Sequence, residues 1–342
     1  MPFCKIFFVF AIVLGSLRAS GQYGGRNPSF SELDEYARTV PEASSRSIDA
    51  LASYLSKKGK TETEKARLVF TWIATHIRYD DAAFNTKKYP EQSAEGVLKR
   101  RAAVCAGFSS LFVDLARQMG LKSATISGYA KGYGFKEGDK IEKINHDWNA
   151  VKIDETWHLM DATWGRGYSQ STNAGLKSVM ELDDSWFMVA PEQFIFSHFP
   201  VDEPWQLLPA PITLDQFNQL PKVQKSLFTL GFDASQIFSA ALADSKLQMV
   251  QTFKSTFGVK IVEAPFTNPL VKGQRYTFKF VSSEIKRMAI AEDLEWTYLT
   301  PKDNVFSIDF TPRSRTVEVN VSKSAKTSTW NTIMVYQVIG KK

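Results

Sequence analysis

The hydrophobic pattern of this chain changes near Lys122, and that change restricts the folds open to it. Residues 29–79 and 105–119 place apolar side chains at helical spacing, whereas later segments read as short strands. The chain has 342 residues, of which 44% are hydrophobic, so it can bury a large core and is not disordered. We therefore expect an α+β fold, with helices packed on an antiparallel sheet.

Two of the expected helices have clear ends. Thr61 and Glu64 form a capping-box pattern ahead of an apolar stripe that reaches residue 77. A second stripe runs from Cys105 to Met119 and is followed by Gly120, a common helix stop. Cys105 is thus expected in the first turn of a helix.

Residues 148–153 and 156–163 are expected to pair as a β-hairpin around a two-residue turn at Asp154 and Glu155. In that register Ile153 pairs with Thr156, so Asp161 lies opposite Trp148. His146 is two residues from Trp148 and therefore on the same face. The pattern predicts His146 and Asp161 as a diagonal cross-strand pair within reach of each other.

The last third of the chain is expected to form a separate β-rich part. Prolines cluster after residue 200, residues 212–245 show short helical patterns at 214–220 and 235–242, and six strand-like runs follow, about the number that a small β-sandwich needs. These runs are 259–262, 275–281, 286–291, 305–310, 316–321 and 332–338. The expected division is a signal peptide at 1–21, a catalytic domain at 22–210, a helical connector at 211–245 and a β-sandwich-like domain at 246–342.

The first residues indicate export. Lys5 precedes an apolar run over residues 6–17, and the small residues at 19–21 resemble a signal-peptidase site. The run is shorter than the roughly 20 apolar residues of a membrane span, so we expect no membrane anchor and a secreted or periplasmic protein. Of the two cysteines, Cys4 would leave with the signal and Cys105 would remain. The net charge of +6 falls to a mild +4 once Lys5 and Arg18 leave with the signal, and no nucleic-acid-binding module is recognisable.

A lone cysteine can be a buried hydrophobe, an intermolecular disulfide partner or a reactive thiol. The helix N-terminus favours thiolate at Cys105, and its amides could hold an oxyanion. His146 is the candidate base and Asp161 the group that orients it. His158 lies on the opposite face from Asp161, and neither His76 nor His198 has a local context that indicates catalysis. We expect no metal site and no cofactor, since no His, Cys or acidic residues show metal-ligand spacing.

Three segments of this chain resemble the Cys, His and Asp motifs of transglutaminase-like cysteine enzymes, in particular the kyphoscoliosis-peptidase and cytokinesis-type branch. They are residues 103–109 (AVCAGFS), 145–151 (NHDWNAV) and 157–165 (WHLMDATWG). Residues 72–80 and 194–208 resemble flanking segments of that branch. The resemblance implies a papain-like core in which Cys105 is the nucleophile, His146 the general base and Asp161 its orienting group. It also implies that Trp164 either shields the site or packs in the core.

The resemblance leaves the oxyanion-binding side chain open. Many papain-like enzymes place a glutamine shortly before the cysteine, but residues 99–102 read KRRA here, which leaves Gln92 and Tyr79 as candidates. No acidic loop suggests activation by calcium.

We therefore expect an exported thiol enzyme that cleaves amide bonds of peptides or proteins, cell-wall peptides among them, through a thioester intermediate. Hydrolysis is favoured over cross-linking. The alternatives are a non-catalytic binding or scaffold module on the same fold and a true protein-glutamine acyltransferase.

Overall fold

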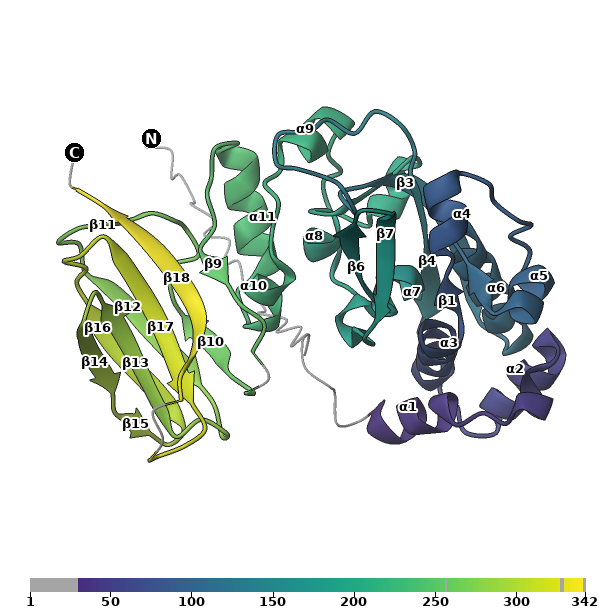
Figure 1. Ribbon diagram of the computed structural model, residues 1–342, viewed down its shortest axis with the longest axis horizontal. Helices are drawn as coiled ribbons and strands as arrows, with labels where there is room; N and C mark the ends of the chain where they lie inside the picture. The colour runs from purple at the N-terminus through teal and green to yellow at the C-terminus, as the bar shows by residue number, and fades with distance from the viewer. Residues whose placement is uncertain (1–29, 256, 327–328, 341–342) are drawn as a thin grey trace, which may run out of the picture.

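Helices form the first part of the described chain, as the early spacing predicted (Figure 1). The computed structural model describes residues 30–255, 257–326 and 329–340, so the predicted signal peptide and Cys4 lie outside the described residues. The helices of this part are α1 (Ser31–Arg38), η2 (Glu42–Ser45), α2 (Ile48–Ser56), α3 (Glu62–His76), α4 (Asp81–Thr86), α5 (Ala94–Arg100) and α6 (Cys105–Gln118).

Both helix predictions are confirmed. The Thr61 hydroxyl accepts a 3.2 Å hydrogen bond from the Glu64 amide, and the Glu64 carboxylate accepts one of 3.0 Å from the Thr61 amide, which completes the capping box of α3. Helix α6 begins at Cys105 and buries its predicted apolar stripe. Two short parallel strands, β1 (Arg78–Tyr79) and β2 (Ala102–Ala103), join the end of α3 to the residues that precede Cys105.

The helices pack on an antiparallel sheet whose strand order is β5-β4-β3-β8. Its strands are β3 (Lys122–Ala130), β4 (His146–Ile153), β5 (Thr156–Met160) and β8 (His198–Pro200). Helix α6 contacts both β3 and β4. The side-chain amide of Asn149 in β4 donates hydrogen bonds of 3.2 Å to the carbonyls of Ser109 in α6 and Ala124 in β3. Helix α6, which begins at Cys105, is therefore held to the strand that carries His146.

The β4–β5 hairpin has the predicted register, with Ile153 opposite Thr156. Asp154 and Glu155 both take left-handed backbone angles, with φ of 48° and 61°, as a two-residue hairpin turn requires. The predicted strand over residues 156–163 is too long, because β5 ends at Met160. Asp161 instead caps a helical turn, α7 (Ala162–Gly165), whose first amides need an acceptor.

A second hairpin follows α7 and was not predicted. It comprises β6 (Gly167–Thr172) and β7 (Gly175–Met180), and it contacts α4. Between this hairpin and β8 lie η3 (Asp184–Trp186) and α8 (Pro191–Phe194). The 3₁₀ turn η4 (Glu203–Gln206) follows β8.

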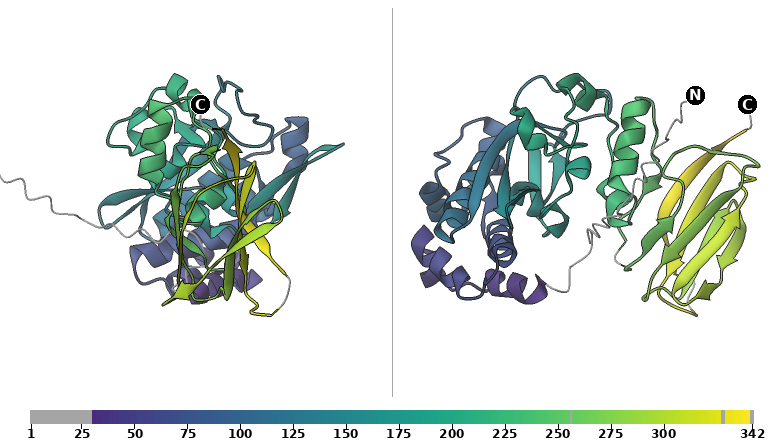
Figure 2. Two further views of the ribbon diagram at one scale, coloured as in Figure 1. Left: turned by 90° about the vertical axis from the view of Figure 1, so that its left-hand side faces the viewer. Right: turned by 180° about the vertical axis from the view of Figure 1, so that it is seen from behind.

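The helical connector lies between the N-terminal part and the C-terminal sheets in Figure 1 and in the right-hand view of Figure 2. Its helices are α9 (Leu214–Gln219), α10 (Lys225–Thr229) and α11 (Ala234–Ala243), which confirms helices near both predicted positions. Lys225 of α10 reaches back into the N-terminal part, where its Nζ lies 2.9 Å from Oδ2 of Asp183 and 3.7 Å from the centre of the Trp186 ring.

Two sheets form the C-terminal part, and each of the six predicted runs is a strand there. Their strands pair antiparallel except for β11, which pairs parallel with β18. One sheet has the order β10-β12-β16-β15, and the other has the order β11-β18-β17-β13-β14 with β9 paired to β18. The strands are β9 (Gln251–Thr252), β10 (Lys260–Glu263), β11 (Leu270–Val271), β12 (Tyr276–Val281), β13 (Arg287–Glu292), β14 (Glu295–Leu299), β15 (Pro301–Lys302), β16 (Val305–Phe310), β17 (Thr316–Ser322) and β18 (Asn331–Ile339).

The apolar core of the sandwich continues into the N-terminal part. Phe278 and Tyr336 meet between the two sheets with ring centres 5.8 Å apart. The same buried cluster includes Phe217 of the connector, Phe199 in β8 and Phe196 just before it. The domain boundaries at residues 210 and 245 stay predictions. Among the described residues, no helix is both long enough and apolar enough to cross a bilayer.

Candidate active site

Cys105 is the first residue of α6, as predicted, and its side chain is partly exposed. The N-cap residue, Val104, has no side-chain group that could cap the helix. The amides of the first turn therefore have no side-chain acceptor, and they surround the thiol with partial positive charge. This is a suitable position for a thiolate and for the oxyanion that its attack on a carbonyl would create.

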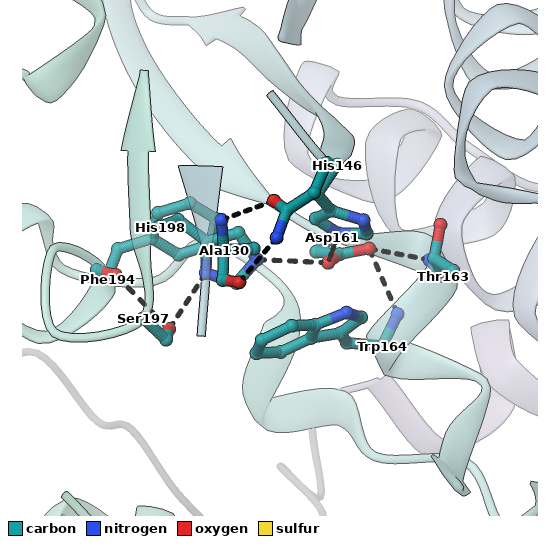
Figure 3. Close-up of polar contacts among 9 residues, drawn as sticks. Ala130, His146, Asp161, Thr163, Trp164, Phe194, Ser197 and His198 are labelled. Carbon is teal, nitrogen blue, oxygen red and sulfur yellow. Dashed lines mark hydrogen bonds and ion pairs between the residues drawn. The ribbon is translucent and has the colours of Figure 1, made fainter. Parts of the chain in front are cut away.

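His146 and Asp161 meet as the hairpin register predicted. Nε2 of His146 lies 2.7 Å from Oδ2 of Asp161, and both side chains are buried (Figure 3). The other carboxylate oxygen, Oδ1, accepts hydrogen bonds of 2.7 and 3.0 Å from the amides of Thr163 and Trp164. Because the helical turn holds Oδ1, Oδ2 is fixed toward the imidazole.

The charges of this pair support each other. Burial alone would lower the pKa of His146, but the Asp161 carboxylate, its hydrogen bond and the neighbouring Cys105 raise it to about 10. Burial would likewise raise the pKa of Asp161, yet the charge and hydrogen bond of His146 hold it well below its usual range. The arrangement therefore favours an imidazolium paired with a carboxylate at neutral pH.

Cys105 is one of the groups that raise the pKa of His146, so its side chain lies close to the imidazole. Since Nε2 of His146 already faces Asp161, the nitrogen left for the thiol is Nδ1. The structure thus brings together the three residues that the sequence predicted, in the order thiol, imidazole, carboxylate.

His198 also belongs to this site. The prediction that the surroundings of His198 do not connect it with the candidate site is wrong. Its Nε2 lies 3.2 Å from Oδ2 of Asp161, and its Nδ1 lies 2.8 Å from the Ser197 hydroxyl. The ring is fully buried and stacks on Phe194, with centres 4.1 Å apart. The available signal was the position of His198 within residues 194–208, which resemble a flanking segment of the family. His158 instead lies opposite Val151 in the hairpin.

Trp164 covers the two histidines. Its ring centre lies 5.4 Å from that of His146 and 4.3 Å from that of His198, and Figure 3 shows it beside the Asp161 carboxylate. The indole is partly exposed, so Trp164 forms a wall between the buried pair and solvent. Of the two interpretations left open by the sequence, shielding describes its position better than core packing.

The two side chains considered for oxyanion binding both lie near the start of α6. Oε1 of Gln92 accepts a 3.1 Å hydrogen bond from the Val104 amide, while its Nε2 donates to the Pro90 carbonyl at 2.7 Å. Gln92 thus turns its oxygen toward the residue before Cys105. Tyr79 stands opposite Ala103 in the β1–β2 pair, and burial and then the nearby Cys105 raise its pKa.

His146, Asp161 and His198 each offer one possible ligand atom, and these atoms lie within 4.8 Å of one another. The sequence spacing did not reveal this grouping. A metal ion bound there would displace the protons that join both imidazoles to Oδ2. The same atoms already form the hydrogen bonds that orient His146. The geometry therefore fits a hydrogen-bonded group that transfers protons better than it fits a metal site.

Comparisons with known proteins agree with the motifs. Residues 49–162 match the family model described as the transglutaminase-like superfamily. Human kyphoscoliosis peptidase is 35% identical over 190 residues, which are 55% of this chain and 28% of that protein. Cytokinesis protein 3 of Schizosaccharomyces pombe is 24% identical over 227 residues, which are 66% of this chain and 25% of that protein. This chain therefore spans about a quarter of the length of those relatives.

Among solved structures, red sea bream transglutaminase aligns with 85% of this chain and 56% of its own, at 8% identity and a TM-score of 0.29. The family assignment rests on the family model and the curated relatives. Residues 49–162 are a domain of the transglutaminase-like superfamily, the family that the three motifs indicated.

Proposed function

We propose that this protein is an exported thiol enzyme that hydrolyses amide bonds of peptides or proteins. The observation that carries the proposal is the buried His146–Asp161 pair, 2.7 Å apart, beside a partly exposed cysteine at a helix N-terminus. The name of the human relative, kyphoscoliosis peptidase, supports a peptidase. Cell-wall peptides are the substrates that export would bring within reach.

The proposed reaction begins with the Cys105 thiolate and the His146 imidazolium. Sγ attacks the amide carbonyl carbon, and the amides at the start of α6 hold the developing oxyanion. His146 gives its proton to the leaving amine as the C–N bond breaks, which leaves a thioester on Cys105. Water then attacks the thioester carbon while His146 takes a proton from that water, and the C–S bond breaks to release the carboxylic acid and return the Cys105 thiolate. Asp161 keeps the imidazole in one tautomer throughout.

Transfer to an amine instead of water would make the protein a cross-linking enzyme. We favour hydrolysis because the sequence has no acidic loop that suggests activation by calcium. Release of product without an added amine would support this choice. Incorporation of a labelled primary amine into a glutamine peptide would favour acyl transfer instead.

The first test is the rate at which iodoacetamide labels Cys105 at pH 7. We expect fast labelling, because the His146 imidazolium lies beside Cys105 at a helix N-terminus, and a loss of at least tenfold in His146→Ala. His158→Ala is the matched control, because His158 lies in the same hairpin without contacting the pair, and it should label at the wild-type rate. An ordinary thiol rate in the wild type would contradict the proposal and favour a binding module on the same fold.

The second test identifies the substrate. The protein and its Cys105→Ala variant are each treated with an activity-based thiol probe and with a complex peptide mixture. Peptide products that form only with the wild type define the cleaved bond. Export is tested separately by the N-terminal mass of protein recovered outside the cytoplasm. Retention of residues 1–21 there would contradict the predicted signal peptide.

A further inference from the structure

We propose that His198 is a positioning residue that acts through Asp161: its Nε2–H donates a second hydrogen bond to Oδ2 and so weakens the hold of the carboxylate on the proton that His146 must pass to the leaving amine. The proposal rests on the proposed function of the triad. The contact that carries it is the 3.2 Å distance between Nε2 of His198 and Oδ2 of Asp161 (Figure 3).

Asp161 accepts hydrogen bonds from four N–H groups, two on each oxygen. The amides of Thr163 and Trp164 bind Oδ1, and the two imidazoles bind Oδ2. The hydrogen bonds from the Thr163 and Trp164 amides already fix the Asp161 carboxylate in place. His198 is therefore not needed to hold it. The effect of His198 falls on the charge of Oδ2, since each donor that an oxygen accepts lowers its affinity for further protons.

The tautomer of His198 follows from its other nitrogen. A neutral imidazole donates from one nitrogen and accepts at the other. If Nε2 donates to Asp161, Nδ1 must accept, and the Ser197 hydroxyl lies 2.8 Å away to donate to it. The alternative acceptor for that hydroxyl, the Phe194 carbonyl, is farther at 3.3 Å. Ser197 therefore sets the tautomer that Asp161 requires.

The surroundings of His198 keep it uncharged while His146 carries the charge. Its ring lies among Phe194, Trp164 and Trp148, with centres 4.1, 4.3 and 5.1 Å away. The titratable groups that face it are Asp161, His146 and, from α10, Lys225. Burial, with smaller effects of His146 and Lys225, lowers the pKa of His198 to about 4 against the pull of Asp161. A neutral His198 can therefore donate to Oδ2 of Asp161 without taking up the proton that the His146 imidazolium carries.

The test compares two substitutions of similar size. His198→Gln keeps an N–H donor near the position of Nε2, whereas His198→Phe keeps a ring against Phe194 and removes the donor. The full-length protein has four histidines, so labelling with ring-¹⁵N histidine gives few proton signals from ring N–H groups. The readout at pH 7 is the chemical shift of the His146 Nε2 proton, which moves downfield as its hydrogen bond to Asp161 strengthens.

In His198→Phe we expect the His198 signal to disappear and the His146 signal to move downfield, because Oδ2 has lost its competing donor. In His198→Gln the His146 signal should return to its wild-type position. An unchanged His146 signal in the phenylalanine variant, or a glutamine variant that behaves like phenylalanine, would overturn the proposal.

Two measurements keep the outcomes distinct. If His198→Phe does not fold, Ser197→Ala provides the test: loss of the Nδ1 partner should weaken the donor and move the His146 signal part of the way downfield, and no movement would overturn the proposal. Iodoacetamide labelling of the wild-type protein tests the proposed function separately. Fast labelling without the expected shifts would reject only the role of His198, whereas an ordinary labelling rate would reject the function and the role that rests on it.

Discussion

Asn149 and Ser109 join the two elements that must meet in the proposed active site. Nδ2 of Asn149, in the strand that begins at His146, donates a 3.2 Å hydrogen bond to the Ser109 carbonyl, in the helix that begins at Cys105. Both residues are almost fully buried. The distance between thiol and imidazole therefore depends on a contact between residues that perform no chemistry.

Asn149→Ala should lower the free energy of unfolding by about 1–3 kcal/mol, because the carbonyls of Ser109 and Ala124 lose a donor in a buried place. It should also slow the labelling of Cys105, since the helix is no longer fastened to the strand. Urea titration and iodoacetamide labelling measure the two effects. Asn331→Ala, at an exposed position where β18 begins, is the control and should change stability by less than about 0.5 kcal/mol. Equal stability of the two variants would refute this account.

Asp161→Asn should slow amide cleavage by about 10³–10⁴-fold, by analogy with the serine-protease aspartate, because an amide can donate to His146 and favour the wrong tautomer. The rate of product formation from the peptide found with the thiol probe measures this loss. Asp147→Asn is the matched control. Its carboxylate lies next to His146 in sequence but binds the Ser127 hydroxyl, so its activity should stay within about threefold of wild type. Similar losses in both variants would contradict the role of Asp161.

The free energy of unfolding should decrease as the pH falls from 6.5 to 4, because His198 is buried in its neutral form. The pKa of His198 is lowered to about 4 in the native state, while the unfolded chain keeps a value near 6.5. In that window the unfolded state binds a proton that the native state does not, so the free energy of unfolding decreases as the pH falls. His198→Gln should reduce this decrease by about 1–3 kcal/mol, measured by urea titration at several pH values. Parallel pH curves for the two proteins would show that His198 is not kept neutral by the fold.

Gly107→Ala should destabilise the start of α6, although alanine ordinarily favours a helix over glycine. A Cβ at this position would lie 2.5 Å from Oε1 of Gln92 and 2.7 Å from Cβ of Ala103. We expect a lower melting temperature and slower labelling of Cys105, two residues away. In Gly96→Ala of α5 the closest atoms, Nη1 of Arg100 and Oγ of Ser93, are both 3.1 Å away on side chains. A Gly107 variant as stable as the Gly96 variant would mean that Gln92 can move aside at little cost.

The helix at Cys105 and the meeting of His146 with Asp161 could be predicted because local patterns determine both. An apolar stripe fixes the face and start of α6, and a two-residue turn fixes the register of every pair in its hairpin. Strand alternation then decides which side chains share a face. The end of β5 could not be found this way, because Asp161 ends the strand by capping the turn that follows.

His198 shows the limit of such reasoning. It lies 37 residues after Asp161, in a strand only three residues long. It reaches the carboxylate because β8 pairs with the edge of β3 that faces away from β4. No periodicity within residues 194–200 encodes that sheet order. The β6–β7 hairpin escaped prediction for a related reason: its residues are mostly exposed, so it lacks the apolar alternation that marks a half-buried strand.

The contact of Lys225 with Asp183 and Trp186 also bears on where the chain can be cut. A fragment that ends at residue 210 would keep Cys105, His146 and Asp161. It would lose the ammonium group over Trp186, and it would present Phe196 and Phe199 to water. We therefore expect the smallest piece able to fold to be longer than residues 49–162, because proteolytic trimming toward the motifs would remove contacts that hold the N-terminal part together.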